Sequence, residues 1–219
     1  MKLPVASYSF LNTWAICPHQ AARKYIVKDL PREPETPEMA WGNAVHEAME
    51  KRLRDKTPLP QSMASYEYWA APLDALKIEP EQKLGMTVEG QPCGFFAKNV
   101  FLRGKLDAPV RLRRDYVMIF DWKTGKRREE PFELAVGALL LQAHWPEVVQ
   151  LLGQYIWLKY SVHGKQHDVS DTARTWAVVK DTMREVECAI VDREFRKTPG
   201  PLCGWCPVLD CQHNTRGRK

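Results

Sequence analysis

Two aspartates and a lysine lie in short segments whose spacing suits a catalytic site. Asp107 ends residues 104–107 (GKLD), and Asp121 and Lys123 belong to residues 121–125 (DWKTG). Side chains alternate between the two faces of a β-strand, so Asp121 and Lys123 should project to the same face. Only a short turn separates the strands that carry the two segments. We therefore expect these strands to be neighbours and to bring Asp107 to the other two residues.

This trio suits the hydrolysis of a phosphodiester. Two carboxylates supply the oxygen ligands that Mg²⁺ and Mn²⁺ prefer. A metal ion so bound polarises the phosphate and lowers the pKa of a bound water. Lys123 could orient that water or stabilise the charge of the transition state, and it could act as a general base if its pKa were lowered. The alternative is a turn that carries only a surface salt bridge.

A predicted helix that starts at residue 36 or 38 and ends at residue 54 carries a further candidate ligand. His46 and Glu50 lie one helical turn apart on one face. Gly42 lies on the same face, where the missing side chain lets another segment approach closely. A neutral imidazole can ligate Mn²⁺. The alternative is a core histidine that is paired with a glutamate.

Three of the six cysteines, Cys203, Cys206 and Cys211, fall within the last 17 residues. In a reducing compartment such a cluster indicates metal binding rather than disulfides. Cys17 is the candidate for a fourth ligand, because it stands in a Cys-Pro context on the first predicted helix. A structural zinc ion, with Cys17 or His213 as its fourth ligand, is one interpretation.

The elements that would position these residues form a mixed pattern. Apolar spacing predicts helices over residues 9–26, 36–54, 65–76, 131–145 and 172–197. Strands are predicted at residues 83–88, 94–110 (one strand or a hairpin), 116–120 and 148–160, whereas residues 161–171 read as a polar loop. The continuous apolar run at 116–120 is typical of a buried central strand. We expect an α/β fold in which helices flank a central mixed sheet.

Composition is that of an ordinary globular protein. The chain has 219 residues, of which 44% are hydrophobic and 27% charged, enough for one domain with a sizeable core. No apolar stretch is long enough to cross a bilayer, and the N-terminus lacks the apolar core of a signal peptide, so we expect a cytoplasmic protein without a membrane partner. The net charge of +5 fits a phosphate-binding surface.

Four segments resemble, in order, the motifs of one family. Residues 8–18 resemble its opening helix, 42–50 (GNAVHEAME) its G-x-x-x-H-x-x-x-E helix, 104–107 its G-x-x-D strand end and 121–125 its D-x-K-T-G core. The chain is thus similar to the RecB-like branch of the PD-(D/E)xK nucleases, which includes the AddB helicase-nuclease, the CRISPR adaptation nucleases and many phage exonucleases. The resemblance runs over almost the whole chain and implies a restriction-endonuclease-like fold.

The resemblance also implies roles for single residues. His46, Asp107 and Asp121 correspond to metal ligands, the carbonyl of Trp122 to a further oxygen ligand, and Lys123 to the catalytic lysine. The resemblance implies Mg²⁺ or Mn²⁺ as the catalytic metal.

One motif of the family departs from its usual form. The family continues with a helix that carries Q-x-x-x-Y, and the matching place here is residues 133–137 (ELAVG). Glu133 replaces the glutamine as a candidate for substrate positioning, and the tyrosine is missing. Gln150 and Tyr155 lie in a predicted strand, one residue off the motif's spacing.

The cysteines fit the iron–sulfur members of this family. By resemblance, a [4Fe–4S] cluster is held by Cys17, Cys203, Cys206 and Cys211. We accordingly expect a single nuclease domain over residues 1–219, with residues 1–30 and the cysteine-rich tail 198–219 joined by the cluster, and structural Zn²⁺ as the alternative.

DNA is the partner that these features imply. Positive side chains near the acidic motifs could hold a phosphate backbone: Arg103, Lys105, Lys126, Arg127 and Arg128. Trp122 and Trp205 are candidates for stacking on bases. We expect a metal-dependent DNA exonuclease that acts on single strands or duplex ends in recombination, repair or phage replication, with a recombination or helicase protein as a further partner. The alternatives are a nuclease-impaired DNA-binding or assembly module and a CRISPR spacer-processing nuclease.

Overall fold

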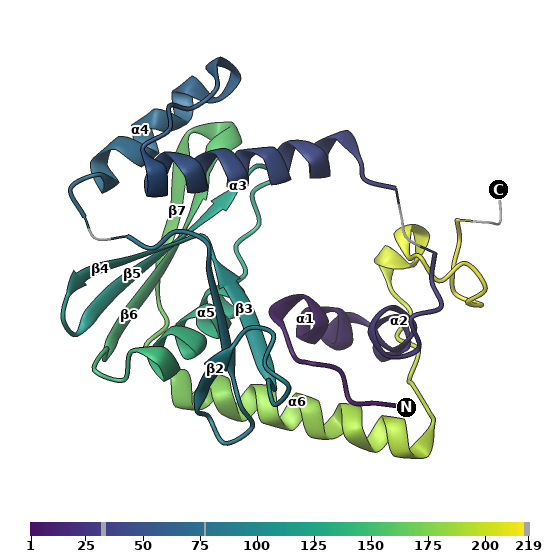
Figure 1. Ribbon diagram of the computed structural model, residues 1–219. Coiled ribbons are helices and arrows are strands. Elements are labelled where there is room, and N and C mark those ends of the chain that lie inside the picture. The colour runs from purple at the N-terminus through teal and green to yellow at the C-terminus, as the bar shows by residue number, and fades with distance from the viewer. Residues whose placement is uncertain (32–33, 77, 217–219) are drawn as a thin grey trace. The chain divides into compact units, whose positions relative to one another are not determined.

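A four-stranded mixed sheet carries the predicted acidic residues. In the computed structural model its order is β4 (Ala108–Arg113), β5 (Tyr116–Lys123), β6 (Gln150–Trp157) and β7 (Val162–Asp168) (Figure 1). β5 pairs antiparallel with β4 and parallel with β6, and β6 pairs antiparallel with β7. Residues 117–119 are buried, as predicted for a central strand. The prediction of a mixed sheet is confirmed.

A second, antiparallel sheet has the order β2 (Pro92–Gly94), β1 (Gln82–Met86) and β3 (Leu102–Leu106). The segment predicted as one strand or a hairpin at 94–110 is therefore divided between two sheets. β3 ends at Leu106 and β4 begins at Ala108. Asp107 lies at the break between them, where the chain passes from one sheet to the other.

Helices cover both faces of the four-stranded sheet. The connection between the parallel strands β5 and β6 contains α5 (Pro131–His144), as parallel pairing requires a crossover. The opposite face carries α3 (Pro37–Asp55), whose buried residues Val45 and Met49 share one hydrophobic cluster with Trp122 and Ile156. Thr36 caps α3 by accepting a hydrogen bond from the N–H of Met39.

The chain divides into two compact units, one of residues Met1–Glu33 and Ala177–Lys219 and the other of Pro34–Trp176. The structure describes residues 1–31, 34–76 and 78–216. The last three residues of the predicted cysteine-rich tail, 217–219, lie outside this range. Among the described residues, no helix is long and apolar enough to span a membrane.

The first unit contains α1 (Tyr8–Ile16), α2 (Pro18–Ala21) and a π-helical segment (Ala22–Val27). The helix predicted over 9–26 is therefore interrupted. Cys17 adopts an extended conformation with φ −158°, because a residue that precedes proline avoids the helical region. α6 (Thr172–Asp192) begins in the second unit and continues into the first, and the tail contains a short 3₁₀ segment (Pro201–Trp205).

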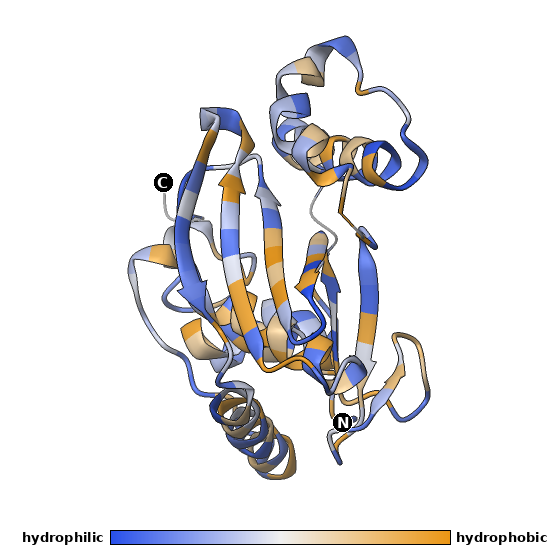
Figure 2. Ribbon diagram, turned by 90° about the vertical axis from the view of Figure 1, so that its left-hand side faces the viewer, coloured by the Kyte–Doolittle hydropathy of each residue, from blue (hydrophilic) through white to orange (hydrophobic). Residues whose placement is uncertain are grey.

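Three further predicted elements were wrong in type or extent. The polar loop predicted over 161–171 contains the edge strand β7, which pairs with β6 (Figure 2). Only Gly164 of β7 is buried, so the strand can be polar along almost its whole length. The helix predicted over 65–76 is a series of 3₁₀ and α turns that includes α4 (Glu67–Ala70). The helix predicted to reach residue 197 ends at Asp192, before Arg193 with φ +56°.

Candidate active site

Asp107, at the end of the first acidic motif, contacts both the D-W-K-T-G segment and His46 of α3. Its Oδ2 accepts a hydrogen bond of 2.9 Å from the backbone N–H of Trp122, and its Oδ1 lies 3.2 Å from Nδ1 of His46. The carboxylate is almost buried, with 9% of the side chain exposed. The β4–β5 pairing brings the D-W-K-T-G segment to Asp107, and α3 adds the histidine from the other side.

Glu81 joins this group, although no sequence motif contains it. Its Oε1 lies 3.4 Å from Nδ1 of His46. His46, Glu81 and Asp107 each have a possible metal-ligand atom, and these three atoms lie within 4.8 Å of one another. Its backbone N–H donates to the carbonyl of Asp107 at 2.9 Å, and its φ of +59° lies in the left-handed region. A non-glycine residue in that region costs about 1 kcal/mol or more, so the surroundings must hold Glu81 there.

The strand register explains the position of Glu81. Gln82 pairs with Leu106, so the residue before β1 lies opposite the residue after β3. The sequence predicted both strands but not that they pair, and this pairing is the signal that would have identified Glu81.

Asp121 and Lys123 project together from the end of β5, on the face covered by α5. Nζ of Lys123 lies 2.8 Å from Oδ2 of Asp121 and 3.0 Å from Oε2 of Glu133. The alternation of the strand thus brings the aspartate and the lysine together as expected, and α5 contributes Glu133 to them.

Burial and neighbouring charges shift the pKa of each group. Burial and, to a smaller extent, the charge of Asp107 raise the pKa of Asp121 to about 8, against the opposing effect of Lys123. Burial lowers the pKa of Lys123, but the charges of Asp121 and Glu133 outweigh it and raise that pKa overall. Lys123 is therefore a cation, and the lowered pKa that a general base would need is not found.

The pKa of His46 is also raised. Burial lowers it, but the hydrogen bond and charge of Asp107, together with the charge of Asp121, have the larger combined effect. His46 and Lys123 therefore share one neighbour, the Asp121 carboxylate, which raises the pKa of both.

Tyr155 completes the surroundings of the lysine. Its hydroxyl lies 2.9 Å from Oε2 of Glu133 and 2.8 Å from the carbonyl oxygen of Glu130, so its one proton is shared between two acceptors. Nζ of Lys123 lies 5.2 Å from the centre of its ring. Tyr155 does lie in a strand, β6, but its Cα partner in β5 is Asp121. The glutamate and the tyrosine that seemed unrelated by sequence spacing therefore meet beside Lys123.

Gly42 allows the D-W-K-T-G segment to approach α3. A Cβ atom at Gly42 would lie 3.2 Å from Oγ1 of Thr124, closer than ordinary van der Waals contact. The expected close approach is present, and Thr124 makes it.

The predicted DNA-binding side chains differ in their surroundings. The guanidinium of Arg103 lies 4.9 Å from the ring centre of Phe95, and Lys105 forms an ion pair with Glu81. Arg128 pairs with Glu130, whereas Lys126 and Arg127 are exposed and form no ion pair within the described parts of the chain.

The two tryptophans singled out for base stacking also differ. Trp122 is only 2% exposed and belongs to the core, so its ring is unavailable to a base, whereas Trp205 is 74% exposed. The expectation that Trp122 could stack on DNA was wrong, because its side chain alternates to the face opposite Asp121 and Lys123.

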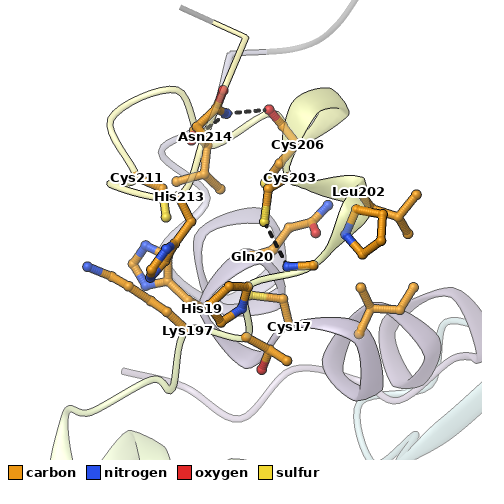
Figure 3. A pocket seen from close by; sticks show the side chains of 16 residues that line it. Cys17, His19, Gln20, Lys197, Leu202, Cys203, Cys206, Cys211, His213 and Asn214 are labelled. Atoms are coloured by element: carbon orange, nitrogen blue, oxygen red, sulfur yellow. Dashed lines mark hydrogen bonds between the residues drawn. The ribbon is translucent and has the colours of Figure 1, made fainter. Parts of the chain in front are cut away.

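The four cysteines proposed as cluster ligands line one cavity of about 150 Å³ in the first unit, together with His213 (Figure 3). Burial raises the pKa of the Cys206 thiol, and the charges of the other three cysteines raise it further.

The cysteine-bearing tail is held by polar contacts. Arg23 pairs with Asp210 at 2.9 Å, and the Asn214 amide donates to the carbonyls of Cys206 and Val208, each at 2.9 Å. The Gly200 N–H donates to Sγ of Cys203 at 3.4 Å.

Comparison with known families identifies the chain. The model of the PD-(D/E)XK nuclease superfamily matches residues 70–211, which include Asp107, Asp121 and Lys123. The protein belongs to this superfamily. No curated protein matches the chain significantly.

Two solved structures are similar to this superfamily member. The crystal structure of SSO0001 shares 14% sequence identity with a TM-score of 0.55, and the match covers 98% of this chain and 88% of that one. A candidate exonuclease from Eubacterium rectale shares 10% identity with a TM-score of 0.56, over 99% and 89% of the two chains. At these identities the likeness shows the fold alone.

Proposed function

We propose that this nuclease is a Mg²⁺- or Mn²⁺-dependent deoxyribonuclease that degrades DNA from single-stranded or duplex ends. The observation that carries the proposal is the convergence of His46, Glu81 and Asp107 beside the Asp121–Lys123 pair. The name of the structural relative from Eubacterium rectale supports an exonucleolytic mode.

The residues present fit a hard divalent cation. Carboxylate oxygens and one imidazole suit Mn²⁺ and Mg²⁺. The raised pKa of Asp121 reflects its burial and the nearby Asp107 carboxylate, and a cation would stabilise the ionised form of both groups. His46, Asp107 and Asp121 would hold the ion with the carbonyl of Trp122, and we add Glu81 to this set. A bound ion would polarise the scissile phosphate and lower the pKa of a water.

Lys123 supplies positive charge to the reacting phosphate. Its raised pKa keeps the ammonium protonated, so the role that fits is stabilisation of the charge that develops in the transition state. Glu133 and Tyr155 hold it in place: Glu133 pairs with the ammonium, and the Tyr155 hydroxyl fixes that carboxylate. Glu133 is in this account a positioning residue for the lysine.

A basic surface on the smaller sheet suits the DNA backbone. Lys83 of β1 is the register partner of Lys105 of β3, and Arg103 lies two residues earlier on the same face of β3. Lys105 is paired with Glu81, so Lys83 and Arg103 supply the positive charge that a phosphate chain along this face would contact. The row ends at Asp107, so a strand bound along it would lead to the acidic residues.

The test is cleavage of end-labelled single- and double-stranded DNA in Mn²⁺, Mg²⁺, Ca²⁺ or EDTA. We expect stepwise shortening in Mn²⁺ or Mg²⁺ and none in EDTA, with Lys123→Met inactive. Absence of cleavage in every metal would favour the nuclease-impaired DNA-binding module, and an equally active Lys123→Met variant would contradict the assigned site.

The shifted pKa of Asp121 predicts how metal stabilises the protein. Without metal, the folded state keeps a proton on Asp121 that the unfolded state releases between the ordinary carboxyl pKa and the raised value of about 8, so stability falls as pH rises through this window. Mn²⁺ binds the ionised form and restores the loss. We expect Mn²⁺ to raise the Tm by at least about 3 °C more at pH 8.5 than at pH 5.5. Equal shifts at both pH values, measured by thermal denaturation, would contradict this linkage, and Asp121→Asn should abolish the difference.

Gly42→Ala should separate stability from activity. Alanine favours the helix by up to about 1 kcal/mol, but its Cβ would displace Thr124 and with it Lys123. We expect kcat to fall roughly tenfold, since a misplacement of about 1 Å can cost about a hundredfold and the displacement needed here is smaller. Gly137→Ala in α5 is the matched control, because its Cβ would meet Leu106 at an ordinary 3.5 Å. Equal activity of the two variants would show that the close approach to Thr124 has no catalytic role.

We also propose that the cysteine cavity holds a [4Fe–4S] cluster, as in the iron–sulfur branch of the RecB-like nucleases. Cys17, Cys203, Cys206 and Cys211 supply four thiols to one cavity, and His213 beside them keeps structural zinc as the alternative. Elemental analysis of protein purified without oxygen distinguishes them. Iron and sulfide that are lost in Cys17→Ser would support the cluster, whereas zinc without iron would contradict it.

A further inference from the structure

An aromatic groove lies at the end of the sheet that also carries Lys123. This groove, called the α4 groove here, is a cavity of about 660 Å³ whose lining includes Tyr68, Trp69, Arg127, Ser161 and His163. Its volume falls within the range of about 300–1,000 Å³ of ligand pockets. Neither the acidic site nor the cysteine cavity uses any of these residues.

Two aromatic rings of the groove lie side by side, and one of them, Tyr68, is exposed to solvent. Tyr68 is 73% exposed and meets Trp69 edge-on, with ring centres 4.9 Å apart. Trp69 packs against the hydrophobic cluster under α3 and meets His163 edge-on at 6.5 Å. The inner ring is therefore anchored, and the outer ring offers its surface to solvent. An exposed ring that is supported by a second, packed ring suits stacking with nucleobases.

The charge of the groove suits a nucleotide. Arg127 is exposed, follows the D-W-K-T-G segment and forms no ion pair with any residue that the structure describes. The described lining contains no aspartate or glutamate. A guanidinium beside aromatic rings binds a phosphate and a base together, whereas an apolar ligand would leave the guanidinium uncompensated.

The strand register gives the separation between the groove and the catalytic lysine. Lys123 pairs with Trp157 of β6, which in turn pairs with Val162 of β7, at the edge of the groove. Two strand spacings of about 4.8 Å put Val162 roughly 10 Å from Lys123. A stacked DNA strand, at roughly 3.4 Å per nucleotide, covers that span in about three nucleotides.

We propose that the α4 groove binds an unpaired base of the substrate strand about three nucleotides from the scissile phosphate, by stacking on Tyr68 and by contact of Arg127 with the backbone. Within a duplex both faces of a base are covered by its neighbours, so the groove selects DNA with a single-stranded segment at this point. The inference rests on the proposed nuclease function and names its substrate class.

The test measures binding of single-stranded DNA with Ca²⁺ in place of Mn²⁺. Tyr68→Ala removes an exposed ring and should weaken binding on the order of tenfold, the effect of losing one base–aromatic stack. Tyr68→Phe keeps the ring and should bind as the wild type does. Binding is also measured with oligonucleotides in which one abasic position is moved along the strand. At a single position the wild type should lose affinity on the order of tenfold. At that position Tyr68→Ala, which already lacks the stack, should show no additional loss of affinity.

The outcomes separate this inference from the proposed function. Unchanged binding by Tyr68→Ala, or an abasic pattern identical in both proteins, would overturn the groove while wild-type cleavage in Mn²⁺ stands. Loss of binding in Tyr68→Ala together with a wild type that cleaves no DNA would uphold the groove as a single-strand site and overturn the nuclease. A wild type that does not bind single-stranded DNA would overturn the groove.

Discussion

Asp121→Asn is expected to lower the rate of metal-dependent DNA cleavage by at least about a thousandfold. The carboxylate is largely buried, with 19% of its side chain exposed, and it would be a direct ligand of the metal ion that stabilises the developing charge. Asparagine keeps the shape and one oxygen but removes the negative charge. The rate is best measured in single turnover at saturating Mn²⁺, where product release does not interfere.

The same substitution should stabilise the metal-free protein. Because burial raises the pKa of Asp121 to about 8, the ionised carboxylate destabilises the folded state above that pH, and asparagine removes this cost. We expect a higher Tm than wild type at pH 8.5 in EDTA and a smaller rise with Mn²⁺ than the wild type shows, because His46, Glu81 and Asp107 remain as ligands. Asp115→Asn is the control, since Asp115 is exposed, lies directly before β5 and is remote from its end at Lys123. A lower Tm for Asp121→Asn would mean a structural role instead.

Glu81→Gln is expected to weaken Mn²⁺ binding by about 10- to 100-fold, the effect typical of losing a group that supports a metal site. The side chain is 3% exposed and lies between His46 and Lys105, and its backbone is bonded to Asp107. Glutamine preserves its size and removes its charge, so activity should return at high Mn²⁺. Calorimetric titration with Mn²⁺ measures the affinity directly.

A neighbouring acid provides the matched control for this prediction. Glu79 lies two residues earlier, is exposed and accepts a hydrogen bond from Gln82. Glu79→Gln changes the net charge by the same amount and should leave Mn²⁺ affinity unchanged. If both variants bind Mn²⁺ as the wild type does, Glu81 is not part of the metal site.

Local periodicity accounts for the part of the site that the sequence predicted. Asp121 and Lys123 meet because a strand alternates, and His46 faces Asp107 because helical spacing places it on the side of α3 that also carries Gly42. Which side chains share a face of a strand or helix depends only on residues close in sequence, so it can be predicted without knowing the tertiary structure.

Residues that depend on long-range pairing were not predicted. Glu81 reaches the site through the β1–β3 register, and Tyr155 reaches Glu133 because β6 lies parallel to β5. Their sequence neighbourhoods carry no sign of these pairings. β7 was missed for a related reason: an edge strand can be almost entirely polar, so its composition is that of a loop.

We propose that one helix and two sheets bring five protein ligands to a single divalent ion: His46, Glu81, Asp107, Asp121 and the carbonyl of Trp122. Anomalous diffraction at the manganese edge, from crystals grown with Mn²⁺, tests it most directly. We predict one strong peak within coordination distance of His46, Glu81, Asp107 and Asp121. A peak elsewhere on the protein, or none at a Mn²⁺ concentration that supports cleavage, would contradict it.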